Sequence, residues 1–415
     1  MSDFIINNKC VLNGEIRISG SKNAALPIMA ACILVSGKTN LANIPALSDI
    51  SIMTGILQSL GASVGSGKDM IIDASFVNKF SAPSDLCTRI RASFLIAGPL
   101  LARFKRAEVP LPGGCRIGSR PVDLHLKGFK ALGADYIIED GYVKLSCKKL
   151  KGTNIYLDFP SVGATQNIIM AATMAEGTTV IENSASEPEI SDLADFLNEC
   201  GARISGAGTD TITIEGVKEL SPCSHTIIPD RIEAGTFMIA AALTGGNVRL
   251  KNVNCSHLNA ISSKLTEAGA LINEFSNELS ISCPEIKKHT DVKTLPFPGF
   301  PTDMQAQFAA LMCQSDGTSV ITETVFENRF MYIPELVRMN ADIKLDGRCA
   351  IIKGGSPLVG AKVRATDLRA GAALVLAGLC AEGKTIVSDA HYINRGYDNF
   401  SDKLRKLGAD VMYVE

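Results

Sequence analysis

Hydrophobic and polar positions along this chain follow one pattern that is repeated six times. In each copy an amphipathic segment with helical spacing ends in Leu-x-x-Leu-Gly-Ala or a close variant, and a run rich in β-branched residues follows directly. The fifth residue of the phrase recurs about every 70 residues, at Gly61, Gly133, Gly201, Gly269, Asn340 and Gly408. Glycine and asparagine adopt the left-handed conformation that closes a helix. Each copy therefore predicts a helix, a tight turn and a strand.

A second phrase alternates with the first. An alanine-rich helix is followed by a turn of small residues and then by a strand, around Gly177, Gly317 and Gly383, with looser copies around Gly37 and Gly245. These helices are apolar around most of their circumference, for example over 168–175 and 370–379. A helix that is apolar on nearly all sides is buried inside a domain. We therefore expect an α/β fold made of six repeats.

The length of the chain favours two domains. A chain of 415 residues is too long for one ordinary core. Six repeats grouped three and three would give two domains of similar size. The boundary is expected near Ile227 to Asp230, where Pro229 interrupts a β-rich run.

Composition and charge narrow the class of protein. Hydrophobic residues make up 46% and charged residues 20%, as in soluble globular proteins. The net charge of −2 shows no bias towards nucleic acid or anionic lipid. The N-terminus does not resemble a signal peptide, and the most apolar stretch, 370–381, is too short to span a bilayer. The twelve cysteines are scattered singly, without a CxxC pair. We expect a cytoplasmic protein that has neither nucleic acid nor membrane as a partner.

The least ordinary segment surrounds Cys115. Glycines at 113, 114 and 118 allow close backbone approach, and Arg116 and Arg120 offer planar groups suited to phosphate or carboxylate. Positive neighbours favour the thiolate form of a cysteine. The alternative is a surface turn with an incidental cysteine.

Further cationic residues stand next to buried helices. Lys22 and Asn23 precede one apolar helix, and Arg91 opens another, where a helix N-terminus would attract an anion. Arg329 and Arg395 occur in weakly charged surroundings. Each has a plainer alternative: a helix cap with a solvated lysine, a basic side chain at a helix end, or a pair with an internal carboxylate.

One carboxylate, Asp303, begins a buried helix. It is either a helix cap or, beside a substrate, a general base. The five histidines are isolated, so no metal-ligand pattern is visible, and no nucleotide-phosphate loop or dinucleotide fingerprint is present. The whole set suits an anionic, phosphorylated substrate handled by acid–base or covalent chemistry without a metal or organic cofactor.

Six longer motifs resemble those of the UDP-N-acetylglucosamine 1-carboxyvinyltransferase family, in the same order from end to end. They are Gly-Ser-Lys22-Asn23-Ala-Ala-Leu-Pro, Leu-Pro-Gly-Gly-Cys115-Arg-Ile-Gly-Ser-Arg120-Pro-Val-Asp-Leu-His125, Phe-Pro-Thr-Asp303-Met-Gln-Ala-Gln, Glu-Asn-Arg329-Phe, Ala-Thr-Asp367-Leu-Arg369-Ala and Arg395-Gly-Tyr. The resemblance implies two inverse (inside-out) α/β barrels, with the active site in the cleft between them. Residues 21–228 would form the domain with the Cys115 loop, and residues 1–20 with 229–415 the other.

The resemblance also implies the reaction. The enolpyruvyl group of phosphoenolpyruvate would pass to the 3-hydroxyl of UDP-N-acetylglucosamine, releasing phosphate, in the first committed step of peptidoglycan precursor synthesis. Cys115 would be the acid and covalent nucleophile, and Asp303 the base. Fosfomycin would then inactivate the enzyme by alkylating Cys115. No cofactor is implied, and the sequence does not indicate an oligomeric state.

Substrate contacts are carried over in the same way. Lys22, Arg120 and Arg395 would hold phosphoenolpyruvate, with Arg329, Arg91 and Arg369 close to the anionic groups. The sugar would contact Asn23, Asp303 and Val325. The uridine pocket would comprise Arg120, Pro121, Val122, Asp123, Leu124 and His125, and the diphosphate would meet Ser161, Val162 and Gly163.

One departure and two alternatives remain. Phe159 and Pro160 stand where the family often has a lysine that contacts the diphosphate. The sister family that uses shikimate 3-phosphate would share the fold and the arginine-rich site. A catalytically silent binder of the nucleotide sugar is the other alternative.

Overall fold

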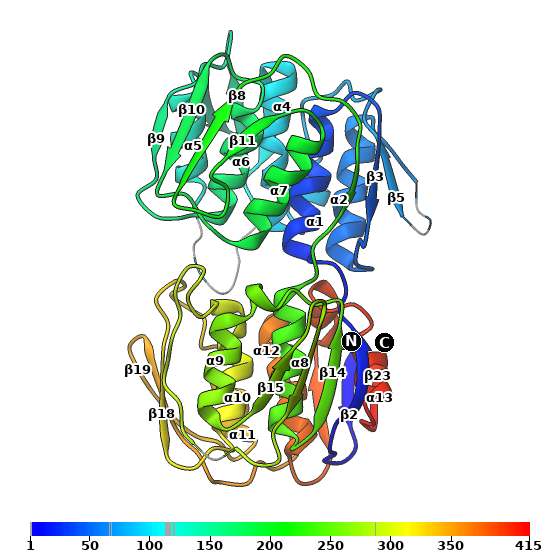
Figure 1. Cartoon of the computed structure of the whole chain (residues 1–415), viewed down its shortest axis with the longest axis vertical. Helices are drawn as coiled ribbons and strands as arrows, with labels where there is room; N and C mark the ends of the chain where they lie inside the picture. The colour runs from blue at the N-terminus through cyan, green and yellow to red at the C-terminus, as the bar shows by residue number, and fades with distance from the viewer. Residues whose placement is uncertain (1, 66, 68, 113–117, 119–120, 287) are drawn as a thin grey trace. The chain divides into compact units, whose positions relative to one another are not determined.

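The structure is a computed structural model that describes all residues except 1, 66, 68, 113–117, 119–120 and 287 (Figure 1). The chain divides into two compact units. The first unit contains the chain up to Ser19 and from Pro229 onwards, and the second contains most of the chain between Gly20 and Ile228. Each unit has its own cluster of buried hydrophobic residues.

The first repeated phrase forms a helix, a left-handed turn and a strand in every copy. The helices are α2 (Ser48–Leu60), α5 (Asp123–Ala131), α7 (Pro188–Glu199), α9 (Asn259–Ala268), α11 (Ile333–Arg338) and α13 (Phe400–Lys406). The strands that follow are β4 (Ser63–Gly65), β7 (Asp135–Glu139), β11 (Arg203–Ser205), β15 (Leu271–Glu274), β19 (Asp342–Asp346) and β23 (Val411–Val414). All six turn residues have positive φ, from 72° at Asn340 to 114° at Gly269. The local prediction is confirmed.

The second phrase also ends in a left-handed turn and a strand. Its strands are β3 (Lys38–Ala42), β10 (Thr178–Glu182), β14 (Asn247–Lys251), β18 (Thr318–Thr322) and β22 (Thr385–Ser388). A sixth copy was not expected from the sequence. Lys105, at φ 59°, makes this turn before β6 (Arg106–Pro110). A lysine in place of glycine concealed it.

Within the described residues the strands form six sheets, three in each unit. The remaining strands are β1 (Asp3–Ile6), β2 (Asn13–Arg17), β5 (Met70–Asp73), β8 (Tyr142–Ser146), β9 (Asn154–Tyr156), β12 (Thr211–Glu215), β13 (Ser224–Thr226), β16 (Glu278–Ser282), β17 (Val292–Lys293), β20 (Cys349–Lys353) and β21 (Lys362–Arg364). Five sheets have one parallel pair followed by two antiparallel pairs, as in β13-β3-β5-β4. In the sixth, β6-β8-β7, a single bridge between Ser81 and Glu108 takes the place of the parallel strand.

Strand β1 shows how remote segments complete one sheet. It lies between β22 and β23 and is antiparallel to both, with Asp3 opposite Ser388 on one side and Val414 on the other. The N-terminal and C-terminal segments therefore belong to the same sheet of the first unit, as the blue and red strands of Figure 1 show.

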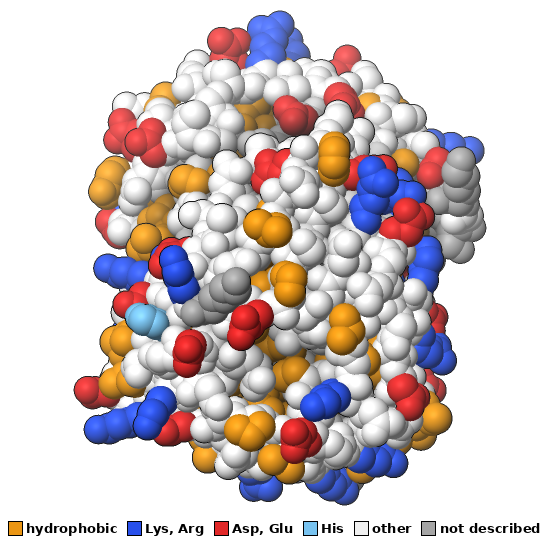
Figure 2. Space-filling model, turned by 60° about the horizontal axis from the view of Figure 1, so that its bottom comes forward, with side chains coloured by type: hydrophobic (Ala, Val, Ile, Leu, Met, Phe, Trp, Pro, Cys, Tyr) orange, Lys and Arg blue, Asp and Glu red, His pale blue; other side chains and the backbone are white. Residues whose placement is uncertain are grey.

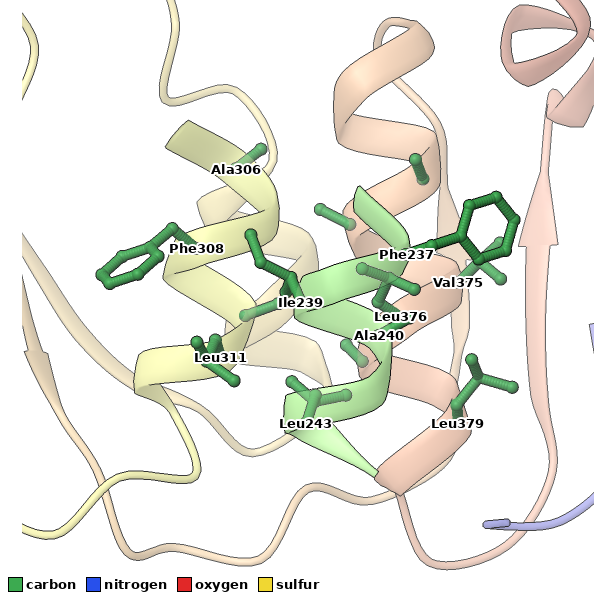
Figure 3. Packing of buried hydrophobic residues seen from close by; sticks show 14 of the residues in the cluster. Phe237, Ile239, Ala240, Leu243, Ala306, Phe308, Leu311, Val375, Leu376 and Leu379 are labelled. Atoms are coloured by element: carbon green, nitrogen blue, oxygen red, sulfur yellow. The ribbon is translucent and has the colours of Figure 1, made fainter. Parts of the chain in front are cut away.

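Apolar helices form the centre of each core. The second unit has α1 (Lys22–Ala31), α4 (Ala97–Phe104) and α6 (Val162–Ala172) at its centre, whereas its short α3 (Ser84–Cys87) is largely exposed. The first contains α8 (Arg231–Leu243), α10 (Gln305–Met312) and α12 (Leu368–Cys380). Every residue of α12 from Arg369 to Leu379 is buried. Figure 3 shows Phe237 and Leu243 of α8 among side chains of α10 and α12. These helices are enclosed because they have no polar face to present to water.

The sheets cover these helices with alternating residues. In β20, for example, Ala350 and Ile352 are fully buried while their neighbours are more exposed. On the face drawn in Figure 2, basic and acidic side chains are interspersed, which agrees with a net charge near zero. Among the described residues, no helix is long and apolar enough to cross a membrane.

Candidate functional site

Asp303 lies at the centre of an ionic cluster in the first unit. It stands in a short 3-10 turn, Thr302–Met304, immediately before α10. One carboxylate oxygen accepts a hydrogen bond from Arg329 at 2.8 Å and the other from Arg369 at 3.0 Å. The arginine side chains are only 4% and 3% exposed, whereas that of Asp303 is 29% exposed. One partly exposed carboxylate is thus paired with two buried cations, so this group of three side chains carries a net positive charge.

Arg369 is fixed from several directions. Asp367, the N-cap of α12, accepts the backbone N–H groups of Arg369 and Ala370 at 2.8 and 3.1 Å. The guanidinium lies 5.2 Å from the ring centre of Tyr397. Burial alone would lower the pKa of Arg369, but Tyr397 and Asp303 raise it above its usual value. Arg369 therefore remains a cation.

A chain of hydrogen bonds continues behind this pair. The Tyr397 hydroxyl is 3.0 Å from Thr236 Oγ1 and accepts a hydrogen bond from Gln307 Nε2 at 3.0 Å. Gln307 also donates to the backbone carbonyl of Asp303 at 2.9 Å. Burial raises the pKa of Tyr397, so the phenol stays neutral. These partners were not predicted from the sequence, although Thr236 and Gln307 are polar residues within otherwise apolar helices.

Two further expected residues belong to this unit. Val325 is half-buried, and its backbone N–H donates to the buried carboxylate of Glu323 at 2.7 Å, which fixes the turn after β18. Arg395 ends the 3-10 segment Ala390–Arg395 and is half-buried, two residues before Tyr397. The expected alternative of an internal carboxylate partner is what the structure shows for Arg329.

Lys22 is buried at the start of α1 in the second unit. Its side chain is 9% exposed, and its ammonium lies 3.4 Å from the carboxylate of Asp49, on the first turn of α2. The neighbouring Asn23 is half-buried. Sequence reasoning missed Asp49, because an aspartate in the first turn of a helix is ordinary and gives no sign of a remote lysine.

His125 and the start of α6 form a second group in this unit. Asn167 donates to His125 Nδ1 at 2.9 Å, so the neutral ring carries its proton on Nε2. The Asn167 amide is oriented by Gly98 N–H, which it accepts, and by the Phe94 carbonyl, to which it donates. A Cβ at Gly163 would lie 3.3 Å from Nε2, so the absence of a side chain there leaves room for the ring.

The charge state of His125 has two physical causes. Burial, and then the positive charge of Arg91, lower the pKa of His125 to about 3. Arg91 opens the 3-10 segment Arg91–Ile96 and is half-buried. The structure therefore brings Arg91 within electrostatic range of His125. At neutral pH the ring is an uncharged hydrogen-bond donor at Nε2.

The expected diphosphate and uridine residues begin two helices. Ser161 caps α6 by accepting the N–H of Ala164 at 3.4 Å, and Val162 and Gly163 form its first turn. Pro121 and Val122 precede α5, whose first residues are Asp123, Leu124 and His125. The α6 N-terminus presents backbone N–H groups that suit an anion. Near it, the exposed Lys127 pairs with Asp158 at 2.7 Å.

Cys115 and Arg120 lie outside the residues that the structure describes. In the described part of the chain, no group of three or more His, Cys, Asp and Glu is arranged to hold a metal ion. The described residues offer a partly exposed carboxylate between two arginines, a buried lysine, a neutral histidine and a capped helix N-terminus. These groups can bind anions and move a proton.

Comparisons with known proteins agree with this chemistry. The family model described as EPSP synthase (3-phosphoshikimate 1-carboxyvinyltransferase) matches residues 6–404. UDP-N-acetylglucosamine 1-carboxyvinyltransferase 1 of Caldanaerobacter subterraneus subsp. tengcongensis is 55% identical over 98% of both chains. UDP-N-acetylglucosamine 1-carboxyvinyltransferase of Geobacter metallireducens is 52% identical over the whole of both.

Solved structures are similar over the same span. The enolpyruvyl transferase NikO from Streptomyces tendae has a TM-score of 0.90 and 26% identity, covering 100% of this chain and 99% of that one. EPSP synthase from Acinetobacter baumannii has a TM-score of 0.79 and 17% identity over the whole of both chains, a likeness that shows the fold alone.

Proposed function

The chain belongs to the EPSP synthase family of enolpyruvyl transferases, and from that premise we propose that it transfers the enolpyruvyl group of phosphoenolpyruvate to the 3-hydroxyl of UDP-N-acetylglucosamine. Phosphate is the second product. The observation that carries the choice of acceptor is the identity of 52–55% to carboxyvinyltransferases named for this nucleotide sugar, over nearly the whole of each chain. The product would enter peptidoglycan precursor synthesis.

The reaction needs an acid and a base. Protonation of the methylene carbon of phosphoenolpyruvate creates a cationic carbon, which the sugar oxygen attacks while its proton is removed. Phosphate then leaves as the newly formed methyl group loses a proton, which restores the carbon–carbon double bond. Cys115 is proposed as the acid, and its sulfur as a nucleophile that can add to the same carbon. Asp303 is proposed as the base that accepts the proton of the 3-hydroxyl.

The contacts of Asp303 support this role. Arg329 and Arg369 both donate to its carboxylate, and neighbouring positive charge favours the ionised form that a base requires. Its side chain is also the most exposed of the three, so a substrate hydroxyl could reach it. Fixed cations beside the base would further offset negative charge on phosphoenolpyruvate and on the departing phosphate.

Residues of both units would bind the two substrates, Lys22, Asn23, Arg91 and Arg120 from the second and Val325 and Arg395 from the first. We assign Lys22, Arg120 and Arg395 to phosphoenolpyruvate, with Arg91 close to the same anionic groups. Asn23 and Val325 are assigned to the sugar. Because Lys22 is held beside Asp49, its ammonium is positioned before any ligand arrives.

The nucleotide is assigned to the two helix starts. Residues 120–125 would line the uridine pocket, where the Nε2–H of neutral His125 is available as a donor. Ser161, Val162 and Gly163 would place backbone N–H groups against the diphosphate. A helix N-terminus can bind a phosphate without the lysine that Phe159 and Pro160 replace.

We further propose the domain arrangement that the family resemblance implies. Residues 21–228 would form one inverse α/β barrel of three repeats, and residues 1–20 with 229–415 the other. Three sheets in each unit, the same strand pairing in five of the six sheets, and centrally buried helices support this arrangement. The proposed reaction would then use residues from both units, Lys22 from one and Asp303 from the other.

The acceptor is tested by measuring phosphate release from phosphoenolpyruvate with a single acceptor present. We expect release with UDP-N-acetylglucosamine and none with shikimate 3-phosphate. Release with shikimate 3-phosphate alone would assign the chain to the sister activity. Binding of the nucleotide sugar without release of phosphate would show a silent paralogue.

Fosfomycin tests the role of Cys115 separately. The epoxide is expected to add to the Cys115 sulfur with complete loss of phosphate release, and mass mapping of cysteine peptides would locate the adduct. Full modification of Cys115 with activity retained would contradict its assignment.

A further inference from the structure

Two cysteines that are not among the proposed site residues lie in contact in the second unit. Cys200 follows the last residue of α7, and Cys223 immediately precedes β13. Their sulfur atoms are 3.1 Å apart, although the residues are separated by 23 positions in the chain. Cys200 also accepts the backbone N–H of Ser221 at 2.8 Å, and the carbonyl of Cys223 accepts Asn40 N–H at 3.0 Å. Backbone hydrogen bonds therefore support the approach of the two thiols.

The two thiols differ in exposure. Cys200 is 1% exposed, whereas Cys223 is half-buried, so a small reagent can reach Cys223 more easily. The thiol hydrogen bond lowers the pKa of Cys223 and raises that of Cys200. The charge of His225, two residues further on, also lowers the pKa of Cys223. The accessible sulfur is thus the better nucleophile, and the enclosed one is its nearest partner.

We propose that Cys200 and Cys223 form an oxidisable dithiol, at which a hydroperoxide produces a disulfide between the end of α7 and β13. The Cys223 thiolate attacks the outer oxygen of the peroxide; the O–O bond breaks, an alcohol or water leaves, and Cys223 becomes a sulfenic acid. Cys200 sulfur, having lost its proton, then attacks Cys223 sulfur. The S–S bond forms, the S–O bond breaks, and the departing hydroxide takes up the proton as water. Two thiols and one peroxide thus give one disulfide, one alcohol or water, and one further water.

A third cysteine, Cys32, is the other possible disulfide partner in this unit. Cys32 is buried and interacts electrostatically with both Cys200 and Cys223. Burial raises the pKa of its thiol, which keeps it protonated and a poor nucleophile. No hydrogen bond between Cys32 and either sulfur is found, whereas it is found for Cys200 with Cys223. We therefore assign the disulfide to Cys200 and Cys223.

The disulfide would have a structural consequence. It would close the loop that carries β11 and β12 and join α7 to β13, which leads to Ile228. Ile228 accepts the backbone N–H of Ser21 at 2.7 Å, just before α1. Because a cross-link restricts the unfolded chain, oxidation should raise the midpoint of thermal unfolding of this unit by roughly 4–16 °C.

Peptide mapping tests the proposal on the full-length protein. The reduced protein is treated with a small excess of hydrogen peroxide, remaining thiols are alkylated, and trypsin is added without reductant. We expect peptide 152–203, which contains Cys200, linked to peptide 219–231, which contains Cys223. The linked species should be absent from C200S and C223S, present in C147S, and reversed by dithiothreitol.

Other results would overturn the proposal. A disulfide between peptide 219–231 and peptide 23–38, which contains Cys32, would show that Cys223 pairs with Cys32 rather than with Cys200. Conversion of Cys223 to a sulfinic acid with Cys200 still alkylated would show that no resolving reaction occurs. If Cys200 and Cys223 both stay reduced while Cys115 is oxidised, the proposal is also overturned, because the pair does not react with the peroxide. The peptide masses are measured without an activity assay, so the outcome does not depend on whether the proposed enolpyruvyl transfer is correct.

Discussion

Asp303 combines a chemical and a structural role on the scale of single residues. The substitution Asp303→Asn keeps the shape of the side chain but removes its charge and its capacity to accept a proton. We expect turnover to fall about 10²–10⁴-fold, the range that general acid–base catalysis contributes. Initial rates of phosphate release at saturating concentrations of both substrates would measure it.

A matched control separates this effect from a general loss of charge. The control is Asp342→Asn, at an exposed residue that begins β19. The rate of phosphate release by this variant should stay within about twofold of that of the original protein. An Asp303→Asn enzyme with more than about a tenth of the original turnover would contradict the assignment of the base.

His225 predicts a pH dependence of stability. It contacts Asp192 at 3.1 Å and Glu199 at 2.9 Å. Burial lowers its pKa, but these carboxylates raise it to about 9, above the ordinary value of 6.5. The stabilisation of the folded protein by protonated His225 is therefore complete below pH 6.5 and is lost as the pH rises through about 9. The difference between 6.5 and about 9 corresponds to about 3 kcal/mol in the free energy of unfolding, and partial exposure to solvent reduces this to about 2 kcal/mol.

Urea unfolding of the original protein and of His225→Gln, at pH 6.5 and at pH 10, measures this contribution. Because other groups also titrate over this range, the relevant quantity is the difference between the two proteins. The variant should be less stable at the lower pH, and the gap should close at the higher pH. A gap that is the same at both pH values would mean that protonation of His225 does not stabilise the fold.

Several site partners could not be predicted from the sequence at this scale. Asp49 and Asn167 are ordinary helix residues in the sequence, and they matter because folding places them against Lys22 and His125. Asp303 could be selected, because it begins a buried helix within a motif that resembles the family's, although a helix cap was the alternative. Its two arginine partners, at the start of α12 and beyond β18, could be named but not paired, since no local spacing links them.

At the scale of elements, the left-handed turns carry most of the information that the sequence holds about the fold. Gly201 has φ 102°, and a Cβ there would meet no atom within 4 Å. The substitution Gly201→Ala should therefore lower the free energy of unfolding by about 1 kcal/mol through backbone conformation alone. Denaturant unfolding would measure it.

The equivalent turn at Asn340 supplies the control. Asn340→Gly places the preferred residue at φ 72° but removes a hydrogen bond to the Pro357 carbonyl, so we expect a change within about 0.5 kcal/mol. Equal destabilisation by both changes would show that side-chain contacts, rather than φ, determine the cost.

The same turns explain which helices and strands could be predicted from the sequence and which could not. Glycine or asparagine marks all six copies of the first phrase, so their helices and strands could be found. Lys105 occupies the corresponding position of one second-phrase turn and concealed it. Strand pairing was harder to predict. The partners β2 and β14 are more than two hundred residues apart in the chain, and no local pattern specifies such a contact.

On the scale of the whole molecule, the two units have separate hydrophobic cores. Phe4 is 1% exposed in the first core, where its ring lies 6.0 Å from that of Phe400. The substitution Phe4→Ala should lower the stability of the first unit by about 3–5 kcal/mol through the cavity it leaves. Hydrogen exchange followed by mass spectrometry would show faster exchange in 229–415 than in 20–228.

Phe196, fully buried in the second core, is the matched control. Phe196→Ala should instead make hydrogen exchange faster in 20–228 than in 229–415. If either substitution accelerates exchange equally throughout the chain, the two cores unfold as one cooperative unit.

The position of β1 has a consequence for the order in which the chain can fold during synthesis. Its partners β22 and β23 are synthesised more than 150 residues after Ile228, whereas the second unit is complete once Ile228 has emerged from the ribosome. The second unit can therefore fold during translation. The first unit must keep the apolar residues Phe4 and Ile6 without these partners until 385–414 have been synthesised, so a nascent chain stalled before residue 385 should expose them to chaperones.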